Sequence, residues 1–208
     1  NGQVTVMTVG AEAQAEALKH GLAIGCDQAI RLWDPALASG DSLAYASAAA
    51  AAIRKLGDVD LVIFGKEMSD SASDQHVFQT ARKLGWTMIG FVAKIEAIDF
   101  AARTIRVRRM TDQGSEVVSG RLPAVISVLK DINEPKYPTF IGIRKAAKAE
   151  IPVWSLADLG LSADQVGLDR ALTSVAAAVR RPPRTAGQIV TDDGDGGVRL
   201  VEFLTTHK

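Results

Sequence analysis

In the first half of the chain, short apolar runs alternate with helical segments, and a glycine follows most of them. Three runs have the length and composition of strands: Val4–Val9, Ala29–Trp33 and Leu61–Phe64. Three segments between and after them are predicted as helices: Glu12–Ile24, Leu43–Leu56 and Asp74–Leu84. This alternation predicts an α/β fold with an open, mostly parallel sheet.

The second half of the chain changes character. Three strand-like segments separated by polar turns predict an antiparallel excursion from the sheet: Ile89–Ile98, Thr104–Arg109 and Glu116–Val118. The apolar segment Leu122–Leu129 is expected to return to the main sheet. A loop then follows Asn133-Glu134-Pro135, and a basic helix is predicted around Ile143–Lys148.

The C-terminal quarter is predicted to form an arm. Trp154–Leu161 closes an α/β domain of residues 1–160, and residues 161–208 form the arm. Within the arm, Leu168–Arg181 is expected to be partly helical and Val198–Thr205 to form an amphipathic helix. Pro182–Arg184 and Asp192–Gly197 are expected to be extended. A compact domain with such a tail often uses it to hold a partner.

Composition excludes several classes of protein. The 24 basic residues balance the 24 acidic ones, so no net positive field exists to attract nucleic acid. The apolar run at Ala46–Ile53 is too short to cross a bilayer, and we expect no direct membrane insertion. The single cysteine, Cys26, excludes an intrachain disulfide, which fits a reducing compartment.

The sequence carries no recognisable catalytic constellation. The three histidines, His20, His76 and His207, are too far apart for metal-ligand spacing. Neither a Gly-x-Gly-x-x-Gly loop, a Walker lysine loop nor a nucleophile elbow is present. Cys26 is interpreted as a small packing residue. The alternating Arg106, Arg108 and Arg109 fit either a solvated strand face or pairing with carboxylates of a partner.

Several blocks, in order along the chain, resemble the beta subunit family of electron transfer flavoproteins. They are Leu22–Ile30, Asp60–Lys66, Leu122–Val125, Asn133–Pro138, Ala157–Leu161 and Arg184–Gly187. The Asn-Glu-Pro-Lys-Tyr-Pro block at Asn133–Pro138 is the most specific of them. The resemblance covers most of the chain.

The resemblance implies a fold, partners and cofactors. The α/β domain would be of the adenine-nucleotide alpha-hydrolase-like type, and the chain would pair with an alpha subunit that holds most of one FAD. The beta subunit would shield this flavin, bind AMP in its own domain and receive electrons from a flavin dehydrogenase. The arm and terminal helix would pack on the alpha subunit. Bacterial cytoplasm and mitochondrial matrix both fit such a protein.

The family usually begins with a strand, a loop and a helix upstream of the segment that matches Val4–Gly10. We therefore expect the natural N-terminus to lie outside the printed sequence. The resemblance leaves open which dehydrogenase is the donor, what the acceptor is and whether the protein is bifurcating. It also leaves open whether AMP, a second FAD or nothing fills the site in the beta subunit.

A nucleotide site is predicted where a buried strand meets the next helix. Free N–H groups at a helix N-terminus favour an anion. The resemblance assigns these residues to the nucleotide: Val9, Gly10, Gly65, Asp70, Ser73, Asp74, Gln75 and His76. The sequence departs from the family at Asp74, a carboxylate near the expected phosphate, and at Val77, where glycine is usual. We expect the Val77 side chain to obstruct the phosphate. The alternative is that Asp74 only caps the helix and the site is empty.

A second site is predicted for the partner dehydrogenase. The resemblance assigns these residues to a recognition loop: Lys136, Tyr137, Pro138, Thr139, Phe140, Ile141, Arg144 and Lys145. Phe140 would be the apolar anchor, because one exposed aromatic side chain in a partner pocket is the usual form of a hot spot. The basic residues would form a rim that steers an acidic partner. The alternative is that Phe140 packs under its own helix.

Two other functions remain as alternatives. One is a stand-alone module of the stress-protein type that binds an adenine nucleotide on the same fold. The other is an enzyme that uses the Asp70–His76 loop for nucleotide chemistry. A yellow heterodimer distinguishes the flavoprotein subunit from both.

Overall fold

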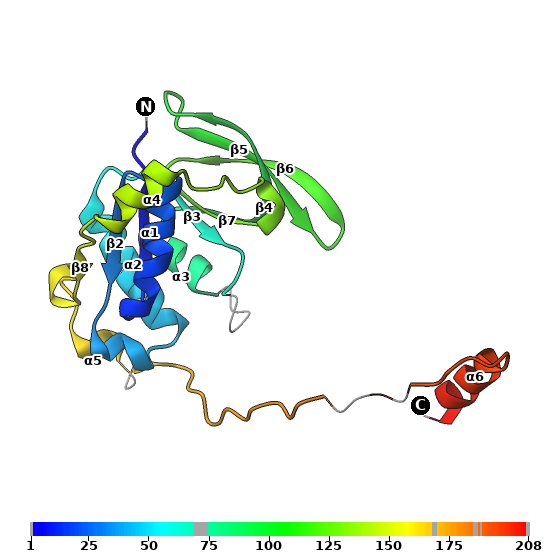
Figure 1. Cartoon of the computed structure of the whole chain (residues 1–208). Coiled ribbons are helices and arrows are strands. Elements are labelled where there is room, and N and C mark those ends of the chain that lie inside the picture. The colour runs from blue at the N-terminus through cyan, green and yellow to red at the C-terminus, as the bar shows by residue number, and fades with distance from the viewer. Residues whose placement is uncertain (1, 69–74, 168–169, 185–186, 188, 207–208) are drawn as a thin grey trace. The chain divides into compact units, whose positions relative to one another are not determined.

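The computed structural model describes residues 2–68, 75–167, 170–184, 187 and 189–206. The chain divides into two compact units, Asn1–Ser174 and Val175–Lys208. The first unit is the α/β domain and the second is the C-terminal arm (Figure 1). The α/β class predicted from the sequence is confirmed.

Three parallel strands form the first sheet, in the order β1, β2, β8. They are β1 (Thr5–Val9), β2 (Gln28–Leu32) and the two-residue β8 (Val153–Trp154). A 3₁₀ turn, η1 (Glu12–Gln14), and helix α1 (Ala15–Ile24) connect β1 to β2. Gly25 ends α1 with a φ of 122°, a conformation that favours glycine, so the predicted C-cap is confirmed.

Five strands form the second sheet, in the order β3, β7, β4, β5, β6. Their bounds are β3 (Leu61–Gly65), β4 (Thr87–Asp99), β5 (Thr104–Thr111), β6 (Gly114–Arg121) and β7 (Ala124–Val128). β7 is parallel to both β3 and β4, whereas β4, β5 and β6 form an antiparallel meander. The predicted excursion and the return of the chain into the sheet are therefore confirmed.

The strands are divided between two sheets instead of forming one. β1 and β3 each occupy an edge, and among the described residues no strand pairs with the outer side of either. Both edge strands are uncharged and apolar, and Ile63 of β3 is 56% exposed.

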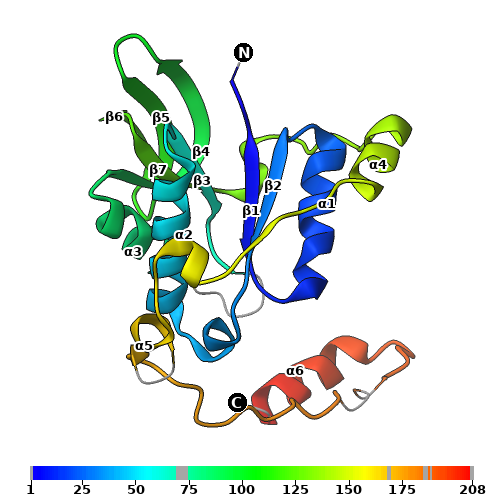
Figure 2. The ribbon, with the colours of Figure 1, turned by 90° about the vertical axis from the view of Figure 1, so that its left-hand side faces the viewer.

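Helices cover both sides of the first sheet. In Figure 2, α1 and α4 (Phe140–Ala147) lie on one side of β1 and β2, and α2 (Ser42–Leu56) lies on the other. Asp41 caps α2 by accepting hydrogen bonds from the N–H groups of Leu43 and Ala44. Small side chains on α2 allow close packing, and six of its alanines are buried.

Helix α3 (Gln75–Leu84) lies beside α2 and packs on the second sheet. Val77 and Ala81 of α3 form a buried cluster with Val125 of β7. A separate cluster fills the space around α2 and the first sheet, with Leu32, Leu37 and Val166 among its fully buried members. These clusters fix the positions of α2 and α3, and the N-terminus of α3 lies at the predicted nucleotide segment.

The last third of the chain differs from the prediction in three places. Helix α4 begins at Phe140, three residues before the predicted start, because Thr139 caps it. The predicted partial helix at Leu168–Arg181 is wrong over residues 171–181, where the structure has none. A short helix that was not predicted, α5 (Ala163–Val166), precedes that segment.

The arm ends in helix α6 (Gly196–Thr206), which confirms the predicted terminal helix. The helix begins two residues earlier than expected, so Gly196 and Gly197 are helical and not extended. Asp192 causes this early start by accepting hydrogen bonds from the N–H groups of Gly194 and Gly196. A search of the described helices found none with the length and hydropathy needed to span a bilayer.

Candidate functional site

The predicted nucleotide segment is described at its two ends. Gly65 ends β3, and among the described residues only the Glu67 carbonyl oxygen would lie near a methyl group built on it, at 3.9 Å. The His76 ring lies edge-on to the ring of Phe64, with 5.6 Å between centroids. Asp70, Ser73 and Asp74 lie outside the described residues. The structure therefore brings His76 to the end of β3.

Gln75 connects the first turns of two helices. Its side-chain oxygen accepts a hydrogen bond from the Ser42 hydroxyl of α2, at 3.5 Å. Gln75 is exposed and His76 is half-buried. The predicted residues Gly65, Gln75 and His76 thus share one end of β3 and α3.

The Val77 side chain does not lie where the family resemblance predicts it, beside a bound phosphate. Its side chain is fully buried and packs with Ala81 and Val125, on the side of α3 that faces the sheet. The expectation that this side chain projects toward a bound phosphate is therefore wrong. The branched side chain contributes to the core instead.

Val9 and Gly10 lie at the end of β1, in the other sheet. The N–H of Gly10 donates to the Leu32 carbonyl at 3.0 Å, and Arg31 donates to the Gly10 carbonyl at 3.3 Å. These contacts join Val9 and Gly10 to β2, not to β3. The predicted site residues therefore form two groups, one at the end of each sheet's edge strand.

The predicted recognition loop is the N-terminal part of a helix together with the chain that enters it. Lys136, Tyr137 and Pro138 lead into Thr139, whose hydroxyl oxygen accepts a hydrogen bond from the Gly142 N–H at 3.0 Å. The remaining residues, Phe140, Ile141, Arg144 and Lys145, belong to α4. All predicted recognition residues therefore lie together in one short segment.

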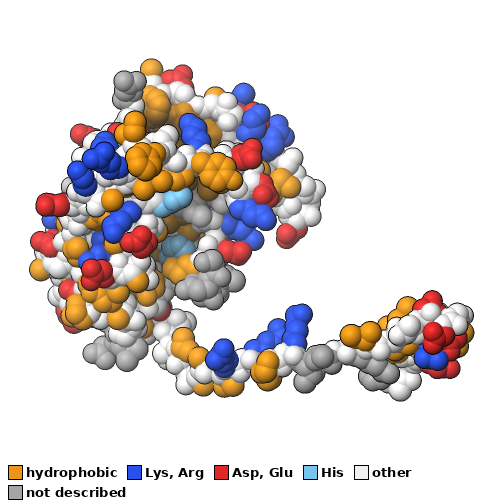
Figure 3. Space-filling model, viewed as in Figure 1, with side chains coloured by type: hydrophobic (Ala, Val, Ile, Leu, Met, Phe, Trp, Pro, Cys, Tyr) orange, Lys and Arg blue, Asp and Glu red, His pale blue; other side chains and the backbone are white. Residues whose placement is uncertain are grey.

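Large apolar side chains protrude from this segment. Tyr137 is 94% exposed, Phe140 80% and Ile141 79%. The alternative in which Phe140 packs under its own helix is therefore wrong. A shallow hollow beside Phe140 and Ile141 is rimmed by Arg144, Lys145 and Lys148. Figure 3 shows hydrophobic and basic side chains gathered over this region.

A close approach of two backbones holds α4 on α1. Gly142 faces the carbonyl group of Ala23 in the last turn of α1, and a methyl group built on Gly142 would overlap the Ala23 oxygen. Ala146, one turn later, is buried. Gly142 is thus a residue on which the recognition segment depends and which was missed from the sequence. Gly142 stands just before the helix predicted from Ile143, so the local pattern gives no signal for this contact.

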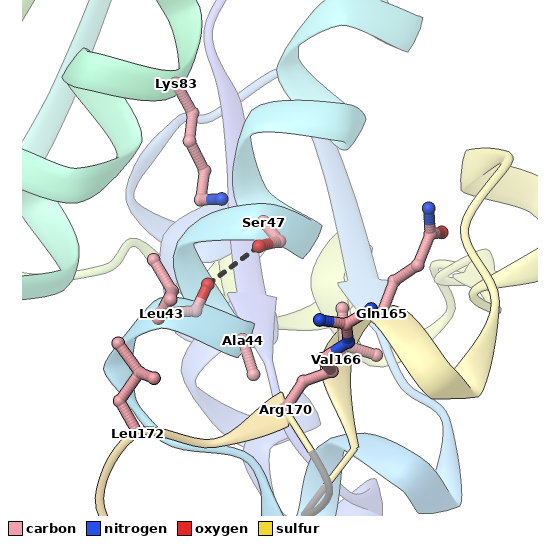
Figure 4. Close-up of a pocket in the computed structure, with 8 residues that line it drawn as sticks. All are labelled: Leu43, Ala44, Ser47, Lys83, Gln165, Val166, Arg170 and Leu172. Carbon is pink, nitrogen blue, oxygen red and sulfur yellow. Dashed lines mark hydrogen bonds between the residues drawn. The ribbon is translucent and has the colours of Figure 1, made fainter.

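A second hollow lies between α2, α3 and α5. Figure 4 shows its lining, to which Lys83 and Arg170 contribute the two charged side chains. The Ser47 hydroxyl in this hollow donates to the Leu43 carbonyl within α2. None of the predicted nucleotide or partner residues that the structure describes lines it.

Arg108 and Arg109 of β5 are paired within the chain. Arg108 forms an ion pair with Glu96 at 3.1 Å, and Arg109 forms one with Glu116 at 3.3 Å. Burial alone would raise the pKa of Glu96, but Lys94 and Arg108 hold it below the ordinary value. These side chains therefore stabilise the meander itself.

Reactive and metal-binding groups are not indicated in the described part of the chain. Burial, and then the nearby carboxylate of Asp27, raises the pKa of the Cys26 thiol, which disfavours the reactive thiolate. Among the described residues, no cluster of three histidine, cysteine or acidic side chains could hold a metal ion.

Comparison with known proteins gives consistent matches over most of the chain. Residues 1–159 match the model of the electron transfer flavoprotein domain. An electron transfer flavoprotein subunit beta from Mycobacterium tuberculosis is 37% identical over 207 residues, which are 100% of this chain and 77% of that protein.

Two further relatives have related names. The caffeyl-CoA reductase-Etf complex subunit CarD of Acetobacterium woodii is 33% identical over 91% of this chain and 71% of its own. Protein FixA of Azorhizobium caulinodans is 36% identical over 77% of this chain and 58% of its own.

Proposed function

The chain belongs to the electron transfer flavoprotein family, and we propose that it is the beta subunit of a heterodimer whose alpha subunit holds most of one FAD. Its relatives are electron carriers and not enzymes, and the chain accordingly performs no bond chemistry of its own. It shields the flavin and selects the flavin dehydrogenase that donates the electrons.

The exposed apolar surface of α4 carries the proposal. Tyr137, Phe140 and Ile141 expose three large apolar side chains within five residues, which is costly in water unless a partner covers them. The helix is rigidly mounted on α1 and rimmed by Arg144 and Lys145. A central apolar anchor with a charged rim is the usual anatomy of a transient protein interface.

The arm supplies a second surface, which we assign to the alpha subunit. Val198, Val201 and Leu204 recur every three residues along α6, and each is about half or more exposed. Such a stripe is typical of a helix that packs on another protein. Residues 175–184 carry no helix or strand in the structure, so the arm has the form of a linker with a terminal anchor.

We further propose that AMP binds where β3 meets α3. Among the described residues, only the Glu67 carbonyl oxygen lies within 4 Å of a methyl group built on Gly65, and Gln75 is exposed, which supports a nucleotide at this point. N–H groups in the first turn of a helix favour a phosphate. FAD, which the alpha subunit would mainly hold, would supply the electron-carrying ring system.

Co-expression with the alpha subunit of the same organism tests the proposed function. We expect the two chains to co-purify as a yellow heterodimer, and denaturation followed by chromatography to release FAD and AMP in stoichiometric amounts. FAD without AMP would reject only the AMP assignment. A colourless monomer, prepared with the complete natural N-terminus, would reject the flavoprotein subunit and favour the stand-alone nucleotide-binding module.

Replacement of Phe140 by alanine tests the recognition surface. We expect the rate of flavin reduction by the donor dehydrogenase to fall by about tenfold, because the largest exposed anchor is lost. Flavin content should not change, since Phe140 is 80% exposed and supports no core. Stopped-flow absorbance at the flavin band measures both.

The matched control for Phe140→Ala is Phe100→Ala. Phe100 is also exposed, at 61%, but lies in the turn between β4 and β5. Its replacement should leave the rate within twofold. Equal rates for the wild type and Phe140→Ala would contradict the assignment of α4 as the donor surface.

A further inference from the structure

The side chain of Asp41 bonds to two segments that are far apart in the sequence. Its Oδ1 accepts hydrogen bonds from the N–H groups of Leu43 and Ala44, at 3.0 and 3.1 Å, and so caps α2. Its Oδ2 accepts hydrogen bonds from the N–H groups of Leu172 and Thr173, at 2.8 and 3.3 Å. One carboxylate therefore joins the start of α2 to the last residues of the α/β unit before the arm.

Only a carboxylate can cap α2 and at the same time accept hydrogen bonds from Leu172 and Thr173 equally well. Serine and asparagine cap helices as well as aspartate does, but each offers a single side-chain oxygen as acceptor. Burial by itself would raise the pKa of Asp41, but the four N–H donors outweigh it and lower the pKa from its ordinary value of 3.8. The side chain is therefore ionised at neutral pH and can accept all four bonds.

The segment that Asp41 holds has few other attachments. Arg170 is bonded to the Gly167 carbonyl through its backbone N–H and to the Asp164 carbonyl through its guanidinium. Leu172 is 81% exposed and lies at the rim of the hollow in Figure 4. Beyond Ser174 the chain enters the second unit. The bonds to Asp41 are thus the last ones described before the arm begins.

We infer that Asp41 is a positioning residue that fixes the point on the α/β unit from which the C-terminal arm starts. This inference rests on the proposed function only for its consequence, which is binding of the alpha subunit through the arm. A fixed starting point reduces the conformations that α6 explores before it binds. Release of residues 172 and 173 lengthens the flexible linker and lowers the effective concentration of α6 at its partner surface.

Asp41→Ser separates the two contacts. Serine at this position retains the cap of α2, because Asp41 has the extended backbone, φ −88° and ψ −173°, that a serine N-cap adopts. It cannot also accept from Leu172 and Thr173. We expect amide hydrogen exchange at Leu172 and Thr173, followed by NMR on the isolated subunit, to accelerate by about tenfold or more. Exchange within α2 should change little.

Asp34→Ser is the matched control. Asp34 also caps a helical turn, η2 (Pro35–Ser39), through a bond from the Ala36 N–H at 3.0 Å, but it bonds to no residue of the 170–174 segment. Exchange at Leu172 and Thr173 should be unchanged in this variant. Asp41→Asn retains one carbonyl oxygen as an acceptor. We expect an intermediate rate of amide hydrogen exchange at one of the two residues, Leu172 or Thr173, in this variant.

Two readouts distinguish failure of the inference from failure of the proposed function. Unchanged exchange at Leu172 and Thr173 in Asp41→Ser would overturn the positioning role, whatever the partner. If exchange accelerates, the affinity for the co-purified alpha subunit, measured by calorimetry, should fall by roughly 1.5-fold, because a linker lengthened by a few residues lowers the effective concentration of α6 by about that factor. Accelerated exchange with unchanged affinity for that subunit would overturn the link between Asp41 and partner binding. Failure of the wild-type chain to bind it at all would overturn the proposed function and leave the exchange result standing.

Discussion

Replacement of Gly142 by alanine is expected to displace α4 and to reduce electron uptake from the donor dehydrogenase by roughly a hundredfold. The new methyl group would overlap the carbonyl oxygen of Ala23, and a backbone atom in the last turn of α1 cannot rotate away as a side chain can. Displacement of the helix moves Tyr137, Phe140 and Ile141 together, so the effect should exceed that of Phe140→Ala.

The sign of the change in the free energy of unfolding of Gly142→Ala shows whether the close contact with α1 is present. Alanine in a helix is favoured over glycine by about 1 kcal/mol, so the variant would be more stable if the close contact with α1 were absent. With the contact present, the free energy of unfolding should fall by about 1–3 kcal/mol, as for other overpacked sites. Urea unfolding followed by circular dichroism measures it.

Gly197→Ala provides the control for the same chemical change. Gly197 lies in the first turn of α6, and a methyl group built there has no other atom within 4 Å. This variant should be as stable as the wild type or slightly more stable. A stabilised Gly142→Ala with normal electron uptake would contradict the mounting of α4 on α1.

The start of α4 illustrates what the sequence could and could not predict. The basic residues and Pro138 indicated a loop followed by a helix, which is correct in outline. Thr139 is an ordinary N-cap residue, and it places Phe140 in the helix instead of the loop. The contact between Gly142 and Ala23 depends on two segments 119 positions apart in the chain, so no local pattern could reveal it.

In the C-terminal arm, the sequence predicted a helix where the structure has none. Ser174–Arg181 is rich in alanine and has a reasonable local preference for helix, yet these residues are neither helical nor packed. Val175 and Val179 are 85% and 90% exposed. A short segment without tertiary packing cannot offset the cost of helix nucleation, so composition alone overestimated its helicity.

Strand pairing was the part of the fold least accessible from the sequence. The individual strands were located within a few residues, because glycines and β-branched runs mark them locally. Whether β1 and β3 pair with each other depends on which strands lie next to each of them, and not on their own residues. The apolar composition of both strands suggested one continuous sheet. The structure leaves both as edges, and the predicted nucleotide residues are consequently divided between them.

Replacement of Val77 by glycine is expected to lower the free energy of unfolding of the α/β unit by about 2–4 kcal/mol. Loss of a fully buried valine side chain costs about 1.5–3 kcal/mol, and glycine in a helix adds about 0.5–1 kcal/mol. The cavity would open between Ala81 and Val125, beneath α3. The cost is large even though this substitution introduces the residue that the family resemblance led us to expect.

Val77→Gly also distinguishes two roles of the Val77 side chain, obstruction of a phosphate and packing in the core. If the side chain obstructed a phosphate, glycine would raise the AMP content of the purified heterodimer. Because the side chain faces the core, we expect the AMP content to stay constant or fall as α3 loosens. Val175→Gly, at an 85% exposed position in the arm, is the control and should change stability by less than about 0.5 kcal/mol. A stable Val77→Gly protein with more bound AMP would mean that the nucleotide approaches α3 at Val77 itself.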